Sequence, residues 1–391
     1  MVTFLLRIDW QNNTQYKKLD DRRIIQVDCT VQQTMTSTNP YEELAVVLDT
    51  IPNGYPAVED GTHIKVLEWI FTPEEAELAS KMKLSGETAA EMAERLGRPS
   101  KELETLLDTM RSKGQINSWM STRLGARKYG LMPFVVGIYE DQLNRMDEEF
   151  ARLMERYMEL GFKHVVSTEP VIFQVLPVNK SISTELEIHP YQKAEHMIES
   201  ASSWGVRECI CKKQKELVGE PCSYPTTVCL AFVPNVENYF DDSEITKPIS
   251  KEEALRLLKE AEDAGLVHCT YNVQTGHNYL CNCCLCCCGV LRGVGGLEKP
   301  REFIKTDFVM TVNADLCTGC ETCLDRCQFG ALSIPEDVTV VDETRCIGCG
   351  VCAIVCPESA LEIVKSETSE KPPSPENQMD WMTQRAMGRG V

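Results

Sequence analysis

The distribution of cysteine constrains the fold of this chain more than any other feature. The sequence has 20 cysteines in 391 residues, and all but Cys29 lie between Cys209 and Cys356. A chain of this length does not need disulfides to be stable, so this many thiols indicates metal binding. The residues before Cys209 must therefore fold around an apolar core, whereas the later part can fold around its cofactors.

The remaining composition is that of a globular protein, with 43% hydrophobic residues, 25% charged residues and a net charge of −19. The length predicts roughly two to four domains. Because no apolar run reaches about eighteen residues, we predict no membrane span. Charged residues follow Met1 too closely for a secretory signal, so we expect a cytoplasmic protein whose thiols are reduced or bound to metal.

The pattern of apolar and turn residues predicts an α+β multidomain chain. Three short helices, one of them starting at the Thr72 cap, precede a hairpin near Trp119, an order that resembles a winged helix. A second capped helix is predicted from Ser250 to Gly265. The predicted parts are a strand-rich segment (1–65), a winged-helix-like docking module (66–133), an α/β cysteine-rich metal-binding domain (134–296), a cysteine-repeat domain (297–365) and an extended or mobile tail (366–391).

The cysteine-repeat domain contains the clearest motif in the sequence. Each half reads C-x2-C-x2-C-x3-C and is followed by a short strand. Three thiolates from one tight loop and a fourth from elsewhere can converge on the four irons of a [4Fe–4S] cubane, whereas paired zinc sites usually have longer spacers between their C-x2-C pairs. The first half contains Cys317, Cys320, Cys323 and Cys327, and the second contains Cys346, Cys349, Cys352 and Cys356.

Over residues 306–365 this repeat resembles the bacterial two-cluster ferredoxins. In that family the fourth cysteine of each half binds the cluster of the other half. Gln328 stands where the family usually has proline, which shapes a turn but binds no iron. The resemblance implies a ferredoxin-like 2[4Fe–4S] domain in which cluster I is held by Cys317, Cys320, Cys323 and Cys356, and cluster II by Cys346, Cys349, Cys352 and Cys327.

A second set of cysteines precedes the repeat and has no regular spacing. Six thiols within eight residues cannot all bind the same iron, because adjacent side chains diverge. We predict one or two further iron–sulfur clusters here, with structural zinc or a thiol redox switch as alternatives, and leave the pairing open. The candidate ligands are Cys209, Cys211, Cys222, Cys229, Cys281, Cys283, Cys284, Cys286, Cys287 and Cys288, and Cys269 lies between them.

Charge separates the candidate functions. Residues 74–128 contain nine acids and ten bases, which is not the basic surface that DNA binding requires. A docking role therefore fits the winged-helix-like module better than transcription control. Residues 306–365 contain ten acids and three bases, a balance suited to docking on the basic surface of a flavoprotein or of an iron–sulfur or metalloenzyme subunit.

These patterns predict an electron-transfer protein that relays single electrons through several [4Fe–4S] clusters to or from a redox enzyme. The whole chain resembles the cysteine-rich, ferredoxin-bearing iron–sulfur proteins of anaerobic metabolism. We expect a non-catalytic subunit of an oxidoreductase complex and predict no catalytic residue. Two alternatives remain: a redox-sensing winged-helix regulator, and an oxidoreductase that binds substrate at a cluster in residues 209–288.

Overall fold

The structure is a computed structural model that describes residues 39–121, 123–182, 186, 188–367 and 371–391. The chain folds as two units. The first contains Phe71–Met132 and the described residues up to Leu44, and the second contains Ala45–Ile70 and Pro133–Val391. Cys29 and most of the predicted strand-rich segment lie outside the described residues.

The described end of that segment is helical, which corrects the prediction of strands. The apolar run around Val46 lies in α1 (Pro40–Thr50), and α2 (Thr62–Ile70) follows it. Proline at the first helical position, with Glu42 and Glu43 in the first turn, favours a helix over a strand here.

The first unit combines short helices with a small antiparallel sheet, in which the strand order is β1-β3-β2. The Thr72 side chain accepts a hydrogen bond from the Glu75 N–H and starts the first helix at the predicted residue. The expected hairpin is present as β2 and β3. The elements are α3 (Pro73–Ser80), β1 (Glu87–Thr88), α4 (Ala89–Leu96), α5 (Ser100–Ser112), β2 (Asn117–Ser121) and β3 (Ala126–Gly130).

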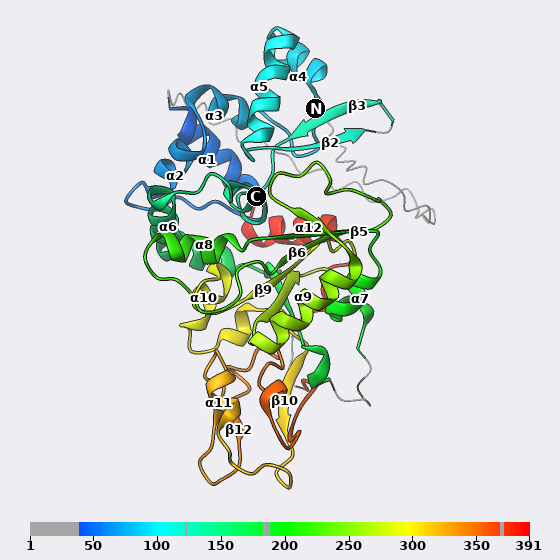
Figure 1. The fold of residues 1–391 in the computed structure, drawn as a ribbon. Coiled ribbons are helices and arrows are strands. Elements are labelled where there is room, and N and C mark those ends of the chain that lie inside the picture. The colour runs from blue at the N-terminus through cyan, green and yellow to red at the C-terminus, as the bar shows by residue number, and fades with distance from the viewer. Residues whose placement is uncertain (1–38, 122, 183–185, 187, 368–370) are drawn as a thin grey trace, which may run out of the picture. The chain divides into compact units, whose positions relative to one another are not determined.

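The second unit is built on a six-stranded sheet with the order β4-β8-β9-β6-β5-β7, in which every neighbouring pair is antiparallel. Figure 1 labels β5, β6 and β9 of this sheet. Its strands are β4 (Phe173–Leu176), β5 (Ser203–Arg207), β6 (Cys229–Val233), β7 (Lys247–Ile249), β8 (Val267–Tyr271) and β9 (Tyr279–Cys283).

The two faces of this sheet bury different side chains. Leu230, Phe232 and Leu280 lie in an apolar core with residues of α7 (Ala194–Glu199) and α9 (Lys251–Ala264). Side chains alternate along a strand, so the residues next to Leu230, Phe232 and Leu280 in the chain point to the opposite face. That opposite face carries the strand cysteines Cys229, Cys269, Cys281 and Cys283.

Three helices pack together beside the cysteines. The helix α6 (Glu148–Val166) contacts both α8 (Ile210–Leu217) and α10 (Gly289–Gly295). It begins at Glu148, because Asp147 accepts a hydrogen bond from the Phe150 N–H and caps it.

The repeat module, residues 297–365, forms two short antiparallel ribbons. Its strand β10 (Phe308–Val312) pairs with β13 (Leu361–Lys365), and β11 (Leu332–Ser333) pairs with β12 (Val340–Val341). The short helix α11 (Thr322–Arg326) lies in the first cysteine half. In Figure 1 these elements are grouped together, away from β5 and β6.

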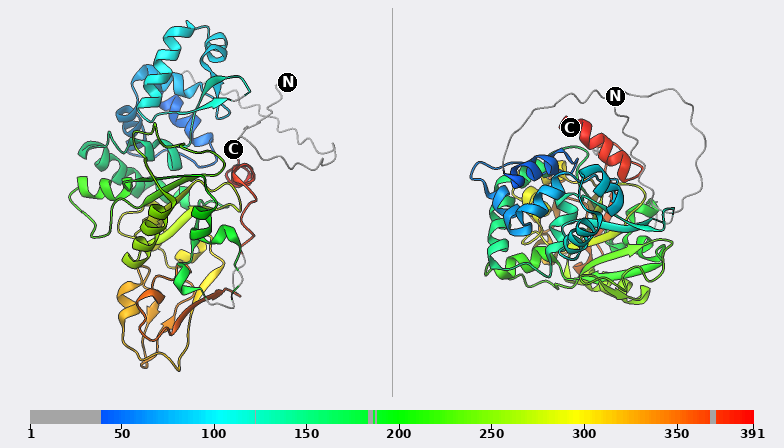
Figure 2. Two further views of the ribbon diagram at one scale, coloured as in Figure 1. Left: turned by 45° about the vertical axis from the view of Figure 1, so that its right-hand side comes forward. Right: turned by 90° about the horizontal axis from the view of Figure 1, so that it is seen from above.

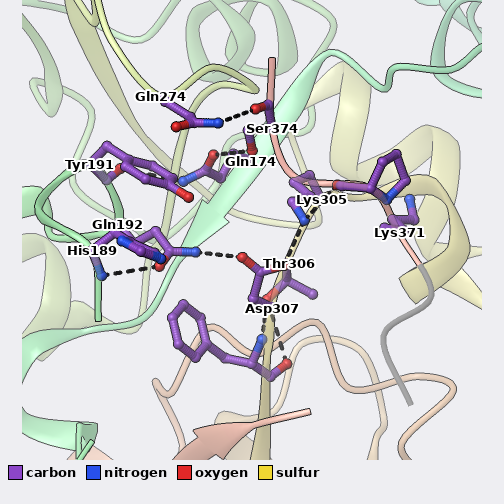
Figure 3. A network of polar contacts seen from close by, with 12 residues as sticks. Gln174, His189, Tyr191, Gln192, Gln274, Lys305, Thr306, Asp307, Lys371 and Ser374 are labelled. Atoms are coloured by element: carbon purple, nitrogen blue, oxygen red, sulfur yellow. Dashed lines mark hydrogen bonds and ion pairs between the residues drawn. The ribbon is translucent and has the colours of Figure 1, made fainter. Parts of the chain in front are cut away.

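The chain that enters the repeat module is hydrogen-bonded to the edge of the large sheet. The Val175 N–H donates to the Lys305 carbonyl at 2.9 Å, and the Lys305 N–H donates to the Phe173 carbonyl at 3.1 Å. The buried Lys305 ammonium lies 2.6 Å from an Asp307 carboxylate oxygen. Figure 3 shows this pair beside Gln192, whose amide donates to the second Asp307 oxygen at 2.6 Å.

The C-terminal segment forms a helix, α12 (Gln378–Arg389), drawn in red in Figure 2. Trp381 and Arg385 are 1% and 0% exposed, and the Arg385 guanidinium donates to the carbonyls of Pro52, Thr168, Pro170 and Val165. The prediction of an extended or mobile tail is therefore wrong for these residues. No local pattern predicted this packing, because a guanidinium that is buried against carbonyls leaves no apolar stripe in the sequence.

None of the helices among the described residues has the length and apolarity needed to cross a membrane.

Candidate metal centres

In the repeat module, each fourth cysteine accepts a backbone hydrogen bond. The Ala331 N–H donates to Cys327 Sγ and the Ala360 N–H donates to Cys356 Sγ, both at 3.3 Å. The two contacts occupy matching positions of the internal repeat. Such N–H···S bonds stabilise thiolates, the form that binds iron.

The module brings its thiols together across the two halves. Burial raises the pKa of Cys323, and the neighbouring Cys320 and Cys356 raise it further. Burial likewise raises the pKa of Cys352, and the thiols of Cys349 and Cys346 in its own half and of Cys327 and Cys323 in the first half add to the effect. The thiols of the two halves therefore lie close together, and their division into two groups is the one that the family resemblance implies. Ligation by these residues stays a prediction.

The second of these groups encloses a cavity. Cys327, Cys346, Cys349 and Cys352 all line it, together with apolar residues that include Phe329. Four thiols around an otherwise apolar space are the surroundings that an iron–sulfur cluster needs. The residues present therefore fit a [4Fe–4S] cluster at this place.

Glycine is required in each cysteine loop for a steric reason. Gly319 and Gly348 have φ angles of +65° and +67°. A Cβ atom on Gly319 would lie 2.6 Å from the Asp337 carbonyl oxygen, and one on Gly348 would lie 2.4 Å from the Phe308 carbonyl oxygen. Both the left-handed backbone and the close approach exclude other residues.

The cysteines between 209 and 288 separate into two groups. The inner cysteine group lies on the sheet face described above, and its thiols contact one another pairwise: Cys209 with Cys211 and Cys229, Cys281 with Cys229 and Cys283, and Cys283 with Cys269 and Cys288. The outer cysteine group is Cys222, Cys284, Cys286 and Cys287, whose sulfur atoms all lie within 4.8 Å of one another. All ten candidate ligands of this region thus fall into one group or the other.

Two helix starts contribute to the inner cysteine group. Cys209 precedes the first turn of α8, and Cys288 precedes the first turn of α10. The amides at a helix start carry partial positive charge and favour thiolate. Hydrogen bonds from the Cys211 and Cys229 thiols lower the pKa of Cys209.

The inner cysteine group is bordered by two polar side chains that the sequence did not single out, the half-buried Glu140 and the buried Tyr139. Burial raises the pKa of Glu140 to about 8, and Cys281 adds to the rise. Burial also raises the pKa of Tyr139, whose hydroxyl donates to the Gln214 amide oxygen at 2.6 Å. No spacing pattern marks these residues, because they lie where one short helical turn ends and the next begins.

Glu155 holds together the helices that carry the inner cysteines. Its two oxygens accept two hydrogen bonds from the Arg292 guanidinium of α10, both at 2.8 Å, and contacts from Gln214 and Lys215 of α8 at 2.5 and 3.0 Å. Burial alone would raise the pKa of Glu155, but Arg292, Gln214 and Lys215 together hold it at about 2. We call these four residues the Glu155 clamp.

The repeat module contacts the cysteine-rich domain through the end of its first half. The Leu285 N–H donates to the Gln328 side-chain oxygen at 2.6 Å, and the Gln328 amide donates to the Gly265 carbonyl at 2.6 Å. Arg326 donates to the carbonyls of Glu262 and Asp263 at the end of α9, where a cation is favoured. Gln328 is the residue that stands where the family usually has proline. Its side chain makes hydrogen bonds between the repeat module and the cysteine-rich domain that proline could not make.

The histidines near these cysteines are hydrogen-bonded. His268 Nδ1 lies 2.6 Å from the Asn282 side-chain oxygen, and His277 Nδ1 lies 3.1 Å from the Thr270 hydroxyl. Neither belongs to the group of side chains close enough to hold one metal ion.

Comparison with known proteins identifies the repeat module. Residues 300–361 match the family model of the 4Fe-4S dicluster domain. The chain carries an iron–sulfur domain. A probable ferredoxin from Methanosarcina thermophila is 47% identical over 38 residues, which are 10% of this chain and 66% of that protein, a little under two thirds of its length. No solved structure matches the chain. [4Fe–4S] clusters are therefore cofactors of this protein, held within a mixed helix and sheet fold.

Proposed function

We propose that this protein relays single electrons between a redox enzyme partner and its own cysteine-rich domain, through cluster I, cluster II and a cluster on the inner cysteine group. A [4Fe–4S] cluster gains or loses one electron without a large change in its ligands, so the chain needs to supply only thiolates, shielding and spacing. The ligands that we propose for clusters I and II are those given by the ferredoxin resemblance.

The position of Cys269 carries this proposal. Cys269 is fully buried on β8, and its thiol lies beside Cys283 of the inner cysteine group. Val267, two residues earlier on β8, lines the cavity around Cys327, Cys346, Cys349 and Cys352 and is paired with Cys283 of β9. The strand β8 therefore borders both the thiols proposed for cluster II and the inner cysteine group, an arrangement that supports electron transfer between them.

The exposed surface around Cys320 supports a docking role. Cys320 is exposed, and so are Asp315, Glu321 and Asp325 around it. Cys349 and Cys352, by contrast, are enclosed. An exposed first cluster within an acidic surface suits a partner with a basic surface around its own redox centre, as in a flavoprotein or metalloenzyme subunit.

We further propose that the first unit is a winged-helix-like module that docks a protein of the same oxidoreductase complex. Its order of helices and strands and its balanced charge support this role over DNA binding. The large number of thiols and the exposure of Cys320 favour the reducing cytoplasm of an anaerobic cell.

The test is a cluster count on protein purified without oxygen. The proposal predicts about twelve irons with matching sulfide per chain, and three reducible clusters by electron paramagnetic resonance. The variant Cys269→Ser should keep the iron of clusters I and II but slow reduction of the inner cluster when electrons are supplied through cluster I. A chain with about eight irons would overturn the relay and leave a two-cluster ferredoxin domain on an adaptor. In a chain with about twelve irons, an unchanged rate of inner-cluster reduction in Cys269→Ser would overturn the route past Cys269.

A further inference from the structure

The outer cysteine group differs in its geometry from the thiols that hold [4Fe–4S] clusters. Cys222 Sγ lies 3.8 Å from Cys284 Sγ, and Cys286 Sγ lies 3.7 Å from Cys287 Sγ. All four sulfur atoms lie within 4.8 Å of one another. In the part of the chain that the structure describes, no other set of three or more possible ligands meets this limit.

The spacing of these sulfur atoms is that of ligands around one ion. A tetrahedral ion with metal–sulfur bonds of about 2.3 Å holds its four sulfur atoms about 3.8 Å apart. In a cubane, each thiolate extends from a different iron, so the ligand sulfur atoms lie further apart. The repeat module serves as an internal comparison, because its cysteines belong to a 4Fe-4S domain and are not gathered within that limit.

The surroundings of the outer cysteine group suit a compact anionic site. The Tyr224 N–H donates to Cys222 Sγ at 3.3 Å. Lys212 is only 2% exposed, and its ammonium donates to the Pro225 carbonyl at 2.5 Å, in the loop that follows Cys222. Four thiolates around a divalent ion carry a net charge of −2, which a buried ammonium partly offsets.

We propose that Cys222, Cys284, Cys286 and Cys287 bind a single tetrahedral Zn²⁺ ion. Thiolates are soft ligands that select zinc over other divalent ions such as Mg²⁺ and Ca²⁺, and zinc binds such sites more tightly than Fe²⁺ does. Four protein ligands leave no open position, so the ion has a structural role.

The ion stabilises the joint between the cysteine-rich domain and the repeat module. It ties the loop at Cys222 to the loop between β9 and α10, and the latter contains Leu285, the contact of Gln328. Because adjacent side chains diverge, fixing Cys284 and Cys287 also directs Cys283 and Cys288 into the inner cysteine group.

X-ray absorption at the zinc edge of the anaerobically purified, full-length protein tests the proposal directly. The expected result is about one zinc per chain with four sulfur neighbours at about 2.3 Å and no neighbouring metal. Absence of zinc, or a single iron without sulfide in its place, would overturn the assignment. This measurement needs no variant and therefore does not depend on whether a variant folds.

Two variants locate the ion. Cys286→Ser removes the exposed ligand and should lose the zinc while keeping the iron and sulfide, and Cys286→His should retain zinc, since imidazole is also a zinc ligand. The matched control Cys320→Ser changes an exposed cysteine of the repeat module and should lose about four irons and no zinc. Loss of iron and sulfide in cubane proportion from Cys286→Ser, with zinc retained, would overturn the site. The electron relay would be unaffected by either result.

Discussion

The repeat module and the cysteine-rich domain both gather many thiols, but they do so in different ways. In the repeat module, three cysteines of each group come from one loop, so the spacing in the sequence already defines the group. In the cysteine-rich domain, the inner thiols come from three strands and two helix starts. A cysteine group built from distant segments depends on the packing that holds those segments together. A substitution far from the cysteines can therefore change how the group binds metal.

The largest expected effect tests the crossed pairing of the repeat module. Cys327→Ala and Cys346→Ala should each remove about four irons, and the double variant should lose no more than either single one, because both residues serve cluster II. Cys327→Ala combined with Cys320→Ala should remove about eight. Iron analysis and electron paramagnetic resonance provide the count, and equal losses in the two double variants would contradict the crossed pairing.

The Glu155 clamp should matter for the inner cysteine group and not for the repeat module. Glu155→Gln is expected to destabilise the fold by about 2 kcal/mol, because it leaves Arg292 and Lys215 without their carboxylate. Glu148→Gln, on the same helix in an exposed ion pair with Arg152, should cost about 0.5 kcal/mol or less. Thermal unfolding under anaerobic conditions measures the stability of both variants. Equal losses of stability would show that the Glu155 clamp stabilises the fold no more than an exposed ion pair does.

The pH dependence of the same variant provides a second readout. The pKa of Glu155 is about 2 in the folded chain, below the ordinary glutamate value of 4.5. Its stabilising contribution is therefore complete above about pH 4.5 and is lost as the pH falls towards 2. The stability difference between the native chain and Glu155→Gln should shrink over that window. A difference that stays constant with pH would contradict the lowered pKa.

A smaller effect is expected where the two regions meet. Gln328→Pro restores the usual ferredoxin residue but removes the contacts to Leu285 and Gly265, and it should cost about 1 kcal/mol. All clusters and the zinc should remain, while electron transfer between cluster II and the inner cysteine group slows. Gln328→Glu is the matched control, since it keeps the acceptor for Leu285. Unchanged transfer rates in the proline variant would show that this contact does not position the module.

The smallest expected effect distinguishes the two clusters of the repeat module. The Thr339 hydroxyl lies 3.5 Å from both Cys317 Sγ and Cys323 Sγ. Thr339→Val removes it and should lower the potential of cluster I by roughly tens of millivolts, because hydrogen bonds to sulfur stabilise the reduced cluster. Cluster II should not shift. A redox titration followed by electron paramagnetic resonance checks this, and an equal shift of both clusters would contradict the assigned groups.

Local features of the fold followed from the sequence. The cap at Thr72, the helix from Ser250 to the left-handed Gly265 and the hairpin near Trp119 all lie where nearby residues predict them. Each depends on hydrogen bonds and backbone angles over a few residues. Local geometry also explains why the repeat module could be predicted as an iron–sulfur domain, since a loop of three cysteines defines its own geometry.

The sequence by itself thus determined that this protein carries [4Fe–4S] clusters and where its dicluster domain lies. Only the tertiary structure decided how the irregular cysteines divide, because strand alternation and chain turns send Cys283 and Cys284, and again Cys287 and Cys288, to different groups. It also decided that α12 is packed within the second unit and that Glu155 clamps α8 and α10. These contacts join residues far apart in the chain, and their energy comes from burial and charge pairing that no local pattern records.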